Sequence, residues 1–488
     1  MPSRRSRDDR ALLRACASFL PADRILTDRG ECALYDCDGL ALHRGVPGGV
    51  LLLESREEVR RAVAAAAKCG VPFVPRGAGT GLSGGAVPLD DAWIFDLTRM
   101  RTIHEIDPIA RRARVDPGVV NLELDEAAAA HGLRYAPDPS SQRACTLGGN
   151  LAENAGGPHC FRYGMTTRHL VALTAILPDG SEVELGEGTG FGPDERGLFV
   201  GSEGTLGIAV EMTVALIPRP EKVRTVLLSF ASLPAACRAV ARIIASGSRP
   251  AALEILDKLT IAAVEASVFR AGYPTDAEAV LLVEGEGSAA EIEEETRAVR
   301  AAGEAEGALA WEEADDEAAR TRLWRGRKGA FGAMGRVARD LYVLDGVVPR
   351  RALAEVVEAI AEVGRRHSLV LSNVFHAGDG NLHPNISFDA RDSEQCDRVL
   401  AAGEEILAIC VEAGGTLSGE HGIGLEKREA MGRVFRPAEL QTQIAVRRAI
   451  NGDELANPGK IFPTGRGCVE AGHRGPGSAA RIEGILGA

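Results

Sequence analysis

The stretch Arg76-Gly-Ala-Gly-Thr-Gly-Leu-Ser-Gly-Gly85 contains five glycines between positions 77 and 85. This density exceeds what a simple turn requires, although a turn is the alternative interpretation. Glycine lacks a Cβ, so we expect this backbone to approach a ligand closely and to bind phosphate through its N–H groups. Gly79, Gly81 and Gly84 also match the G-x-G-x-x-G pattern of dinucleotide sites. That match alone is weak evidence, because the fingerprint has to open a helix.

The flanking sequence places this loop between two strands. Gly49–Leu53 and Val71–Val74 are short apolar runs that predict strands. Between them, a capping box beginning at Ser55 opens a predicted helix that stops at Gly70. This order is typical of a βαβ unit. After the loop, Trp93–Leu97 predicts another strand, so we expect a phosphate-binding loop with no helix behind it.

Two further glycine clusters follow along the chain. Pro137-Asp-Pro-Ser-Ser141 precedes Thr146-Leu-Gly-Gly-Asn-Leu-Ala-Glu-Asn-Ala-Gly-Gly157. Gly201-Ser-Glu-Gly-Thr-Leu-Gly207 precedes the alternating segment Ile208–Ile217, which predicts a strand. Prolines restrain the backbone, while glycines let it approach a flat ligand. Three such clusters predict one extended ligand between two small lobes.

Three of the ten histidines lie in two short motifs, His376-Ala-Gly-Asp-Gly-Asn-Leu-His383 and Ser418-Gly-Glu-His-Gly-Ile-Gly424. Imidazole and carboxylate suit a divalent metal or proton transfer. The segment Ala377–Asn381 predicts a hairpin-like turn that brings its two flanking rings to one side. With Glu420, these rings predict a site for zinc, manganese or iron. A metal-free hydrogen-bonding cluster is the alternative.

The bulk composition excludes several classes of protein. A chain of 488 residues predicts two or three domains, and a formal charge of −13 argues against a nucleic-acid partner. The ten cysteines include no Cys-x-x-Cys, which favours reduced thiols over an iron–sulfur cluster. No apolar run reaches the ~18 residues of a membrane helix, and the basic N-terminus lacks an apolar core. We expect a cytoplasmic protein without a targeting segment, which meets the inner membrane only through partners.

The composition changes near Pro218-Arg-Pro220, which predicts a domain boundary. We expect a helical lead-in over residues 1–45, a first domain over 46–220, a second over 221–463, and a Gly/Arg-rich tail over 464–488. The second domain is predicted to be an α+β sheet layer. Its expected elements are a strand at Thr225–Phe230, a helix at Ala231–Ser246, an Ala/Glu-rich helical stretch, a strand at Ala279–Glu284 and a charged helix at Ala289–Ala302.

Together these motifs resemble those of FAD-linked oxidases of the vanillyl-alcohol-oxidase/p-cresol-methylhydroxylase type, over about residues 20–465. The histidine motifs and Asn457-Pro-Gly-Lys460 resemble its D-2-hydroxy-acid dehydrogenase branch. The resemblance implies an α+β fold: a two-lobed FAD-binding domain and an α+β cap domain with an antiparallel sheet. Longer matches are similar to the flavin subunits of bacterial glycolate oxidases, whereas D-lactate dehydrogenases share the shorter motifs. These longer matches are Tyr35–Leu40, Arg76–Gly85, Tyr135–Gln142, Asn150–Gly157 and Asn373–His376.

The resemblance also implies how FAD is bound. Arg76, Gly77, Ala78, Gly79, Thr80 and Gly81 would wrap its pyrophosphate. Covalent members of the superfamily can carry a histidine where this loop has Thr80, so we expect non-covalent FAD. The other implied cofactor-binding residues are Pro139, Gly148, Gly149, Asn154, Gly157, Gly204, Ile208 and Asn457.

For the reacting centre, the resemblance implies metal ligands at His376, His383 and Glu420. It implies His421 as the base, and Arg327 and Asn385 as substrate-binding residues. The alternative for Arg327 is a surface arginine with no role in the site, because other arginines surround it. Relatives that act on dicarboxylates have a lysine before the Asp-x-x-x-Pro segment, whereas Tyr342-Val-Leu-Asp345 is apolar here. That difference favours a small monocarboxylic substrate.

The implied activity is oxidation of a small 2-hydroxy acid, glycolate to glyoxylate, by hydride transfer to FAD. Electrons would pass to an iron–sulfur subunit and a second flavin-domain-like subunit, and from there to a quinone-type acceptor. One alternative is a D-lactate dehydrogenase that forms pyruvate. Another is a non-catalytic flavin-binding companion subunit, and a third is a metal-dependent hydrolase that uses the same histidines.

Overall fold

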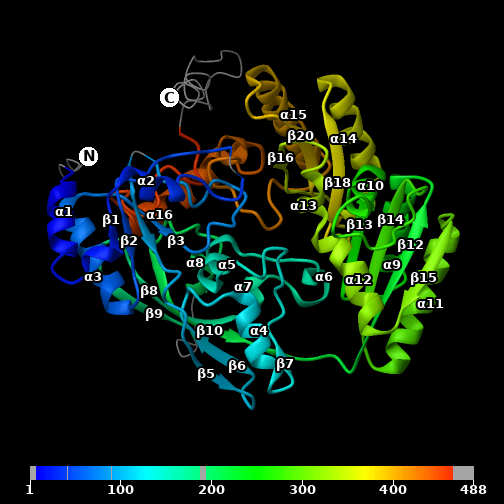
Figure 1. The fold of residues 1–488 in the computed structure, drawn as a ribbon, viewed down its shortest axis with the longest axis horizontal. Coiled ribbons are helices and arrows are strands. Elements are labelled where there is room, and N and C mark those ends of the chain that lie inside the picture. Colours follow the sequence, from blue (N-terminus) through cyan, green and yellow to red (C-terminus); the bar gives the residue numbers. More distant parts are fainter. Residues whose placement is uncertain (1–6, 41, 90, 187–193, 465–488) are drawn as a thin grey trace.

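The computed structural model describes residues 7–40, 42–89, 91–186 and 194–464. All but the first residue of the predicted tail 464–488 therefore lies outside the described residues. Two groups of sheets face each other across the molecule (Figure 1). Among the described helices, none is long and apolar enough to cross a membrane.

The first sheet contains the predicted βαβ unit. Its order is β1-β2-β4-β3, and β2 and β3 both run parallel to β4, which lies between them. The capping box at the start of the helix forms only in half. Ser55 accepts the Glu58 N–H as predicted, but the Glu58 carboxylate accepts the N–H of Glu54 and pairs with Arg24 instead of returning to Ser55. The elements are β1 (Ile25–Leu26), β2 (Val50–Leu52), α3 (Arg56–Cys69), β3 (Phe73–Arg76) and β4 (Trp93–Asp96).

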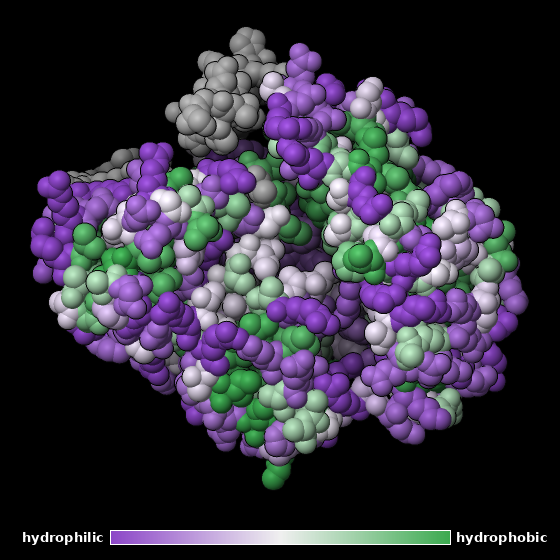
Figure 2. All heavy atoms as spheres, in the orientation of Figure 1, coloured by the Kyte–Doolittle hydropathy of each residue, from purple (hydrophilic) through white to green (hydrophobic). Residues whose placement is uncertain are grey.

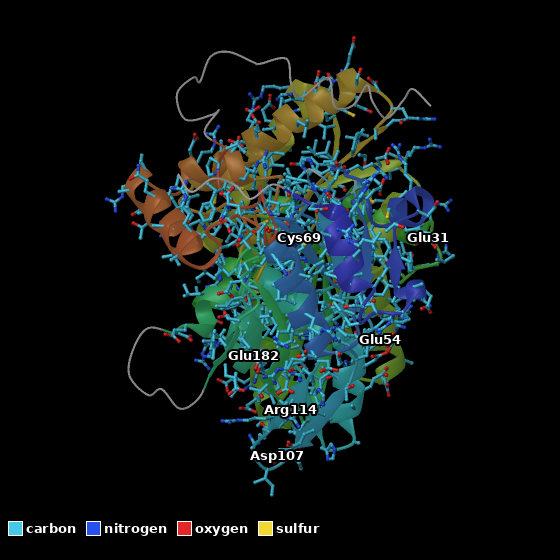
Figure 3. The ribbon with its side chains drawn as sticks, turned by 90° about the vertical axis from the view of Figure 1, so that its left-hand side faces the viewer. Glu31, Glu54, Cys69, Asp107, Arg114 and Glu182 are labelled. Atoms are coloured by element: carbon cyan, nitrogen blue, oxygen red, sulfur yellow. The ribbon has the colours of Figure 1, made fainter. Side chains whose placement is uncertain are left out.

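The second sheet is antiparallel, with the order β5-β6-β10-β8-β9. The predicted alternation is confirmed in β10, where buried and half-buried residues alternate along the whole strand. In the side view, Asp107 and Arg114 lie at one end of the molecule, away from Cys69 (Figure 3). The strands are β5 (Ile103–Asp107), β6 (Arg112–Val115), β8 (Leu170–Ile176), β9 (Glu182–Leu185) and β10 (Ile208–Ala215).

The glycine loop after β3 leads through turns into β4 and opens no helix, as predicted. The C-terminal part of the chain returns to this region. Helix α16 (Pro437–Ile450) precedes Ala456, which forms a parallel bridge with Phe73 beside β3. The same core cluster includes Leu455 and Phe95. Residues near the C-terminal end of the described chain therefore pack against the strands that flank the glycine loop.

The cap is built on a nine-stranded sheet in which β13 lies between β14 and β18. Helices α9, α11, α14 and α15 share one core cluster, and α10, α12 and α13 share another. The strands are β12 (Lys222–Phe230), β13 (Ala252–Asp257), β14 (Ala279–Gly287), β15 (Ala310–Ala314), β16 (Asp340–Val343), β17 (Gly346–Val347), β18 (Val370–His376), β19 (Asn381–Leu382) and β20 (Pro384–Phe388). The helices are α9 (Leu233–Ala245), α10 (Lys258–Glu265), α11 (Ala289–Ala305), α12 (Glu317–Lys328), α13 (Ala330–Met334), α14 (Leu353–His367) and α15 (Ser393–Glu412).

One predicted element of the cap is wrong. The Ala/Glu-rich stretch expected to be helical after Ser246 begins with strand β13, and the helix α10 follows it. The strand pairs on both sides, and residues 252–256 are buried. Burial in the middle of a sheet outweighs the modest helix preference of Ala, Leu and Glu.

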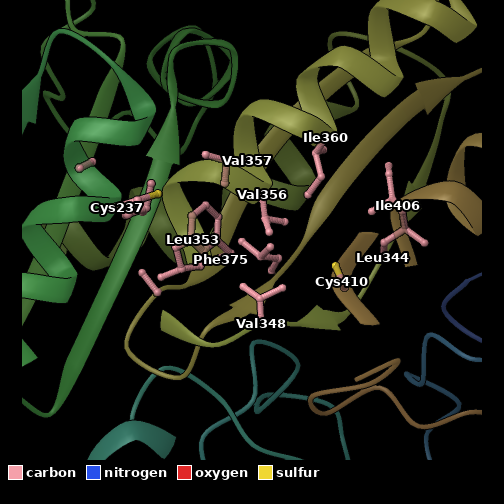
Figure 4. Close-up of a cluster of buried hydrophobic side chains, with 14 of the residues drawn as sticks. Cys237, Leu344, Val348, Leu353, Val356, Val357, Ile360, Phe375, Ile406 and Cys410 are labelled. Atoms are coloured by element: carbon pink, nitrogen blue, oxygen red, sulfur yellow. The ribbon is translucent and has the colours of Figure 1, made fainter. Parts of the chain in front are cut away.

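The core of the cap holds β18 in place. Phe375 packs under Val356, Val357 and Ile360 of α14 (Figure 4). These side chains are almost completely buried. A close-packed interior has low compressibility, so the end of β18, where His376 lies, is a rigid platform.

Candidate active site

A cleft with a volume of ≈ 500 Å³ runs between the glycine loops and the cap. This lies within the range of ~300–1,000 Å³ typical of ligand and cofactor sites. In the space-filling view, residues of intermediate hydropathy gather at the centre of this face (Figure 2). The cleft-lining residues include these predicted cofactor residues: Arg76, Gly77, Ala78, Gly79, Thr80, Gly81, Pro139, Gly148, Gly149, Gly204 and Ile208.

The glycines of the cleft fall into two kinds. An added Cβ at Gly77 would lie 2.2 Å from Thr146 Oγ1, and one at Gly148 would lie 2.7 Å from Pro117. Those glycines let neighbouring loops pack against each other. At Gly81 the nearest protein atoms would be 3.9 Å away, an ordinary contact. Its neighbours therefore do not require glycine there, and bare backbone facing the cleft fits a closely bound cofactor such as FAD.

The Arg76 side chain stabilises the glycine loop through hydrogen bonds to the backbone. Its guanidinium donates to the carbonyl oxygens of Ala86 (3.2 Å) and Cys37 (2.9 Å). Gly79 has φ +67°, and an added Cβ there would lie 2.3 Å from Arg76 Nη2. Glycine at position 79 is therefore favoured by the left-handed backbone and by the Arg76 contact, independently of any bound ligand.

Three predicted cofactor residues support the wall of the cleft and are not among its described lining residues. Asn154 ends α5 (Leu147–Glu153) in the left-handed conformation. An added Cβ at Gly157 would lie 2.5 Å from the carbonyl oxygen of Asp138. Asn457 Nδ2 donates to the carbonyls of Gly85 (2.8 Å) and Glu203 (2.6 Å).

The opposite wall carries the predicted metal ligands. His376 Nε2 lies 3.2 Å and His383 Nε2 3.3 Å from the same oxygen of Glu420. The turn predicted between the two histidines forms, and it brings the ring centroids to within 5.1 Å. All three side chains line the cleft.

The hydrogen bonds of the two rings determine what lies between them. His383 Nδ1 lies 3.1 Å from the carbonyl oxygen of Leu344, and His376 Nδ1 lies 2.7 Å from Glu254. Both acceptors require a proton on Nδ1, so each neutral ring directs its Nε2 lone pair at the Glu420 carboxylate. A divalent cation between these atoms removes the repulsion, and so does a proton. Burial lowers the pKa of His376, but Glu254 and Glu420 outweigh it and raise the pKa to about 10. The donor set therefore fits a metal and also fits the metal-free cluster.

Asp345 holds the second histidine motif in place. Its carboxylate accepts the backbone N–H groups of Gly419 (3.0 Å) and His421 (2.9 Å) and the hydroxyl of Ser418 (2.6 Å). Lys427, which is fully buried, donates to the same carboxylate at 3.2 Å. Sequence reasoning treated Lys427 as the start of a solvated helix, which is wrong because the side chain is fully buried, and it used Asp345 only as the marker of a segment.

His421, the predicted base, lines the cleft beside the metal-ligand set. Its Nδ1 is buried and has no hydrogen-bond partner among the described residues. Burial lowers the pKa of His421 to about 4 despite the nearby Asp345 carboxylate. The free ring is therefore neutral near pH 7 and able to accept a proton.

Arg327, the predicted carboxylate-binding residue, is buried rather than exposed, which excludes the alternative that it is a surface arginine. Its Nε donates to Glu254 at 2.6 Å, while its Nη1 has no partner among the described residues. It is not among the residues that line the cleft, whereas the neighbouring Lys328 is. A buried guanidinium nitrogen without a partner is costly unless a ligand supplies an acceptor.

One part of the cleft lining on the cap is apolar. Phe331, Leu341 and Val343 line it. Leu344, expected to share this role, directly follows β16 and belongs to the core of the cap, because neighbouring side chains along an extended backbone point to opposite faces. Asn385 is fully buried, donates to the carbonyl of His383 (3.0 Å) and is not among the described lining residues.

A second cluster joins the two sides of the cleft. His159 lies 2.9 Å from Asp138 and 3.1 Å from Glu284, and Glu286 pairs with Arg134 at 2.5 Å. Its acids have metal-like spacing, but their oxygens already bond His159, Arg134 and the hydroxyl of Thr225. Burial lowers the pKa of His159, but Asp138 and Glu284 outweigh it and raise the pKa to about 10. This cluster is an ionic network between the part of the chain that precedes the cap and the cap itself, and we call it the lobe-joining network.

Sequence reasoning missed Glu254 and the lobe-joining network. Glu254 is fully buried in β13, where every other residue except the terminal Asp257 is apolar. A lone carboxylate in an apolar strand is the signal that would have identified it, because such a charge needs a partner. The helical interpretation of this segment hid that signal.

Two family descriptions match the chain. "FAD binding domain" matches residues 47–186, and "FAD linked oxidases, C-terminal domain" matches residues 219–461. Solved structures with a similar fold include 4-ethylphenol oxidase from Gulosibacter chungangensis, with a TM-score of 0.78, 17% identity, and 94% and 98% of the two chains covered. They also include p-cresol methylhydroxylase, with a TM-score of 0.77, 16% identity, and 92% and 96% covered. The predicted fold class is confirmed.

Curated relatives match over most of their length. The glycolate oxidase subunit GlcD of Escherichia coli (strain K12) is 46% identical over 469 residues, which cover 95% of this chain and 93% of the relative. GlcD of Bacillus subtilis (strain 168) is 34% identical, covering 88% and 92%. A D-lactate dehydrogenase of Anaerostipes hadrus is 32% identical, covering 83% and 88%.

Proposed function

The chain belongs to the FAD-linked oxidase family, and from this premise we propose that it oxidises glycolate to glyoxylate as the flavin-carrying subunit of a larger complex. One observation carries the proposal most directly. His421 lies beside the converging ligand atoms of His376, His383 and Glu420, on the wall of a cleft whose other wall carries the glycine-rich loops. This arrangement supports an acid–base role for His421 beside the proposed cofactor site.

FAD, when bound along residues 76–81 and 148–149, supplies the acceptor for the C2 hydride of a 2-hydroxy acid. Thr80 has no imidazole for a covalent link, so the flavin is held by non-covalent contacts alone. His376, His383 and Glu420 would hold a divalent ion, which lowers the pKa of a hydroxyl group. Zinc, manganese and iron all suit two imidazoles and a carboxylate.

The side chains of the cap divide the remaining work. His421 accepts the proton of the substrate hydroxyl, since its Nδ1 has no other partner among the described residues. Arg327 binds the substrate carboxylate through its unpartnered Nη1. The apolar Phe331 and Val343 leave a second carboxylate without a partner and help exclude water.

Electrons then leave the subunit. The chain contains no Cys-x-x-Cys motif for a cluster of its own. An iron–sulfur subunit, a second flavin-domain-like subunit and a quinone-type acceptor are the partners we propose, and through them this cytoplasmic subunit would be peripheral to the inner membrane. The domain boundaries at residues 46, 221 and 464 belong to the same proposal.

D-lactate is the second candidate substrate. The apolar surface formed by Phe331, Leu341 and Val343 offers a place for the methyl group that distinguishes lactate from glycolate. D-lactate dehydrogenases are also among the relatives, at lower identity than GlcD.

Anaerobic bleaching of the flavin tests the proposal. Purified protein is mixed with glycolate, D-lactate, L-lactate or D-2-hydroxyglutarate, and the loss of yellow absorbance is followed. Glycolate is expected to give the highest kcat/KM, with D-lactate second. Acid precipitation of the same protein should release all of the flavin, and metal analysis after dialysis should find about one divalent ion per chain. No bleaching by any of the four acids would contradict the proposal.

A further inference from the structure

Glu254 lies directly opposite His376 in the cap sheet. The antiparallel register of β13 and β18 pairs Glu254 with His376, Ile255 with Phe375 and Leu256 with Val374. The Glu254 side chain is fully buried. Such a carboxylate is expensive to bury unless each oxygen has a strong partner.

Both oxygens of Glu254 have a partner, and the two partners belong to different parts of the site. Oε1 lies 2.7 Å from Nδ1 of His376. Oε2 lies 2.6 Å from both Nε and Nη2 of Arg327. Arg327 and His376 also approach each other, with Nη2 3.5 Å from Nδ1.

We propose that Glu254 is a positioning residue that couples the metal ligand His376 to the substrate-binding Arg327. This inference rests on the proposed function. A carboxylate on Nδ1 keeps the proton there, so that Nε2 presents its lone pair toward Glu420, and it makes the imidazole a better ligand. The same carboxylate holds Nε and Nη2 of Arg327, which leaves Nη1 as the free donor for substrate.

The geometry explains why glutamate is needed. Glutamine has one oxygen, so it accepts from His376 or from Arg327, while its NH₂ group faces the other donor. Aspartate keeps the charge, but its side chain is one methylene shorter and cannot maintain both contacts from the same backbone position. Only glutamate supplies two acceptors and the matching charge at this reach.

The test compares Glu254→Gln and Glu254→Asp with a matched control, Glu284→Gln. Glu284 is also a buried glutamate of the same sheet that pairs with a histidine and an arginine, His159 and Arg320, but it lies outside the reacting centre. Flavin-loaded, full-length protein is stripped with a chelator and titrated calorimetrically with Zn²⁺ and with Mn²⁺. Binding of 2-hydroxy-2-methylpropanoate, which has no C2 hydrogen to transfer, is followed by the flavin spectrum.

Glu254→Gln is expected to weaken both the metal and the inert acid by about 10–100-fold, the usual effect of removing a carboxylate behind a metal ligand. Glu254→Asp, which keeps the charge, should recover part of one affinity. Glu284→Gln should lower the thermal midpoint and change both affinities less than about threefold, well below that range. If Glu254→Gln does not fold, Glu254→Asp provides the same comparison against wild type.

Two results with the variants, and one with the wild type, would overturn the inference. One is wild-type metal affinity in the folded Glu254 variants. The other is a loss of metal binding that leaves the affinity for the inert acid unchanged, because the coupling would then be absent. A wild-type protein that binds neither ion also overturns it. Failure of the proposed function is a separate result, since it is read from flavin bleaching by glycolate in the unaltered protein.

Discussion

The imidazole of His421 lies stacked on that of His383, with ring centroids 4.9 Å apart and an interplanar angle of 5°. Adjacent residues, Leu344 and Asp345, hold the His383 ring and the His421 backbone in place. The carbonyl of Leu344 accepts from His383 Nδ1, and the carboxylate of Asp345 accepts the backbone N–H of His421. A short buried segment thus fixes the proposed base relative to a proposed metal ligand, and such preorganisation favours proton transfer in a defined direction.

Replacing the base should separate chemistry from binding. His421→Asn is expected to lower the rate of flavin reduction by ~10²–10⁴, as is typical for a lost acid–base group. The affinity for 2-hydroxy-2-methylpropanoate and the flavin content should stay near wild type, because His421 Nδ1 bonds no other described residue. Rapid mixing under anaerobic conditions measures the rate. Reduction at the native rate would remove His421 from this role.

A pair of glycine variants tests how the cleft holds FAD. Gly81→Ala should leave the flavin-free protein as stable as wild type, because its nearest contacts would be at 3.9 Å. It should weaken flavin binding by about tenfold or more, equivalent to ~1.4 kcal/mol of lost contact. Gly79→Ala should instead lower the stability of the flavin-free protein by about 1–2 kcal/mol, the cost of a left-handed residue with a Cβ.

Thermal unfolding of the flavin-free variants and flavin titration distinguish these effects. If Gly81→Ala bound flavin like wild type, the bare backbone at that position would not contact the cofactor. If Gly79→Ala were fully stable, the Arg76 guanidinium would have to move away from the added Cβ at no cost, and the loop would be less constrained than its contacts indicate.

Two adjacent cations offer alternative carboxylate sites. Arg327→Lys should raise KM for glycolate by at least tenfold, because a point charge replaces the planar fork that Glu254 and the substrate share. Lys328→Met should change KM by about twofold or less, since Lys328 is nearly half exposed and lies 3.7 Å from Asp138. Steady-state kinetics with a dye acceptor measure both. The reverse order of effects would assign the substrate carboxylate to Lys328.

Substrate size and charge should depend on Val343. The apolar Phe331, Leu341 and Val343 offer a second carboxylate no partner, and the nearby Lys328 already pairs with Asp138. D-2-hydroxyglutarate should therefore react at least about a hundredfold more slowly than glycolate, since burying an unpaired charge costs several kcal/mol. Val343→Lys should raise kcat/KM for D-2-hydroxyglutarate and lower it for glycolate. Val343→Met, which adds length without charge, is the control. Efficient oxidation of the dicarboxylate by wild type would contradict the monocarboxylate assignment.

The lobe-joining network predicts a pH-dependent stability. Because the folded pKa of His159 is raised to about 10, its contribution is fully present below the ordinary pKa near 6.5 and is lost as pH rises toward 10. The thermal midpoint of wild type should therefore fall from pH 6.5 to pH 9.5 more steeply than that of His159→Gln. Each kcal/mol lost corresponds to roughly 2–4 °C.

Scanning calorimetry across this pH range makes the comparison, and the difference between the two proteins isolates His159 from the other titrating groups. Parallel curves for wild type and His159→Gln would show that His159 is not held charged between Asp138 and Glu284. The control is His104→Gln, which removes a more exposed histidine beside Asp116 and is expected to leave the slope unchanged.

Part of this architecture follows from local sequence. The loop of residues 77–85, the strands on either side and the turn between His376 and His383 were all predictable, because glycine density, alternation and short turn spacing act over a few residues. The family resemblance predicted FAD and the wall residues from Gly77 to Gly81. The structure brings these five residues together along one cleft.

The rest depended on tertiary structure. Glu254 and His376 are 122 positions apart, and Asp345 and His421 are 76 apart. Their contacts arise from strand register and from the return of the chain to the site, neither of which has a local signature. The segment around Glu254 even suggested a helix, because intrinsic preferences are worth only tenths of a kcal/mol per residue whereas burial between two strands is worth far more. The sequence by itself therefore determined the glycine-rich loops and singled out the histidine motifs as the candidate centre. Only the tertiary structure decided which buried charges hold that centre in place, since the partner of a buried charge is set by long-range packing.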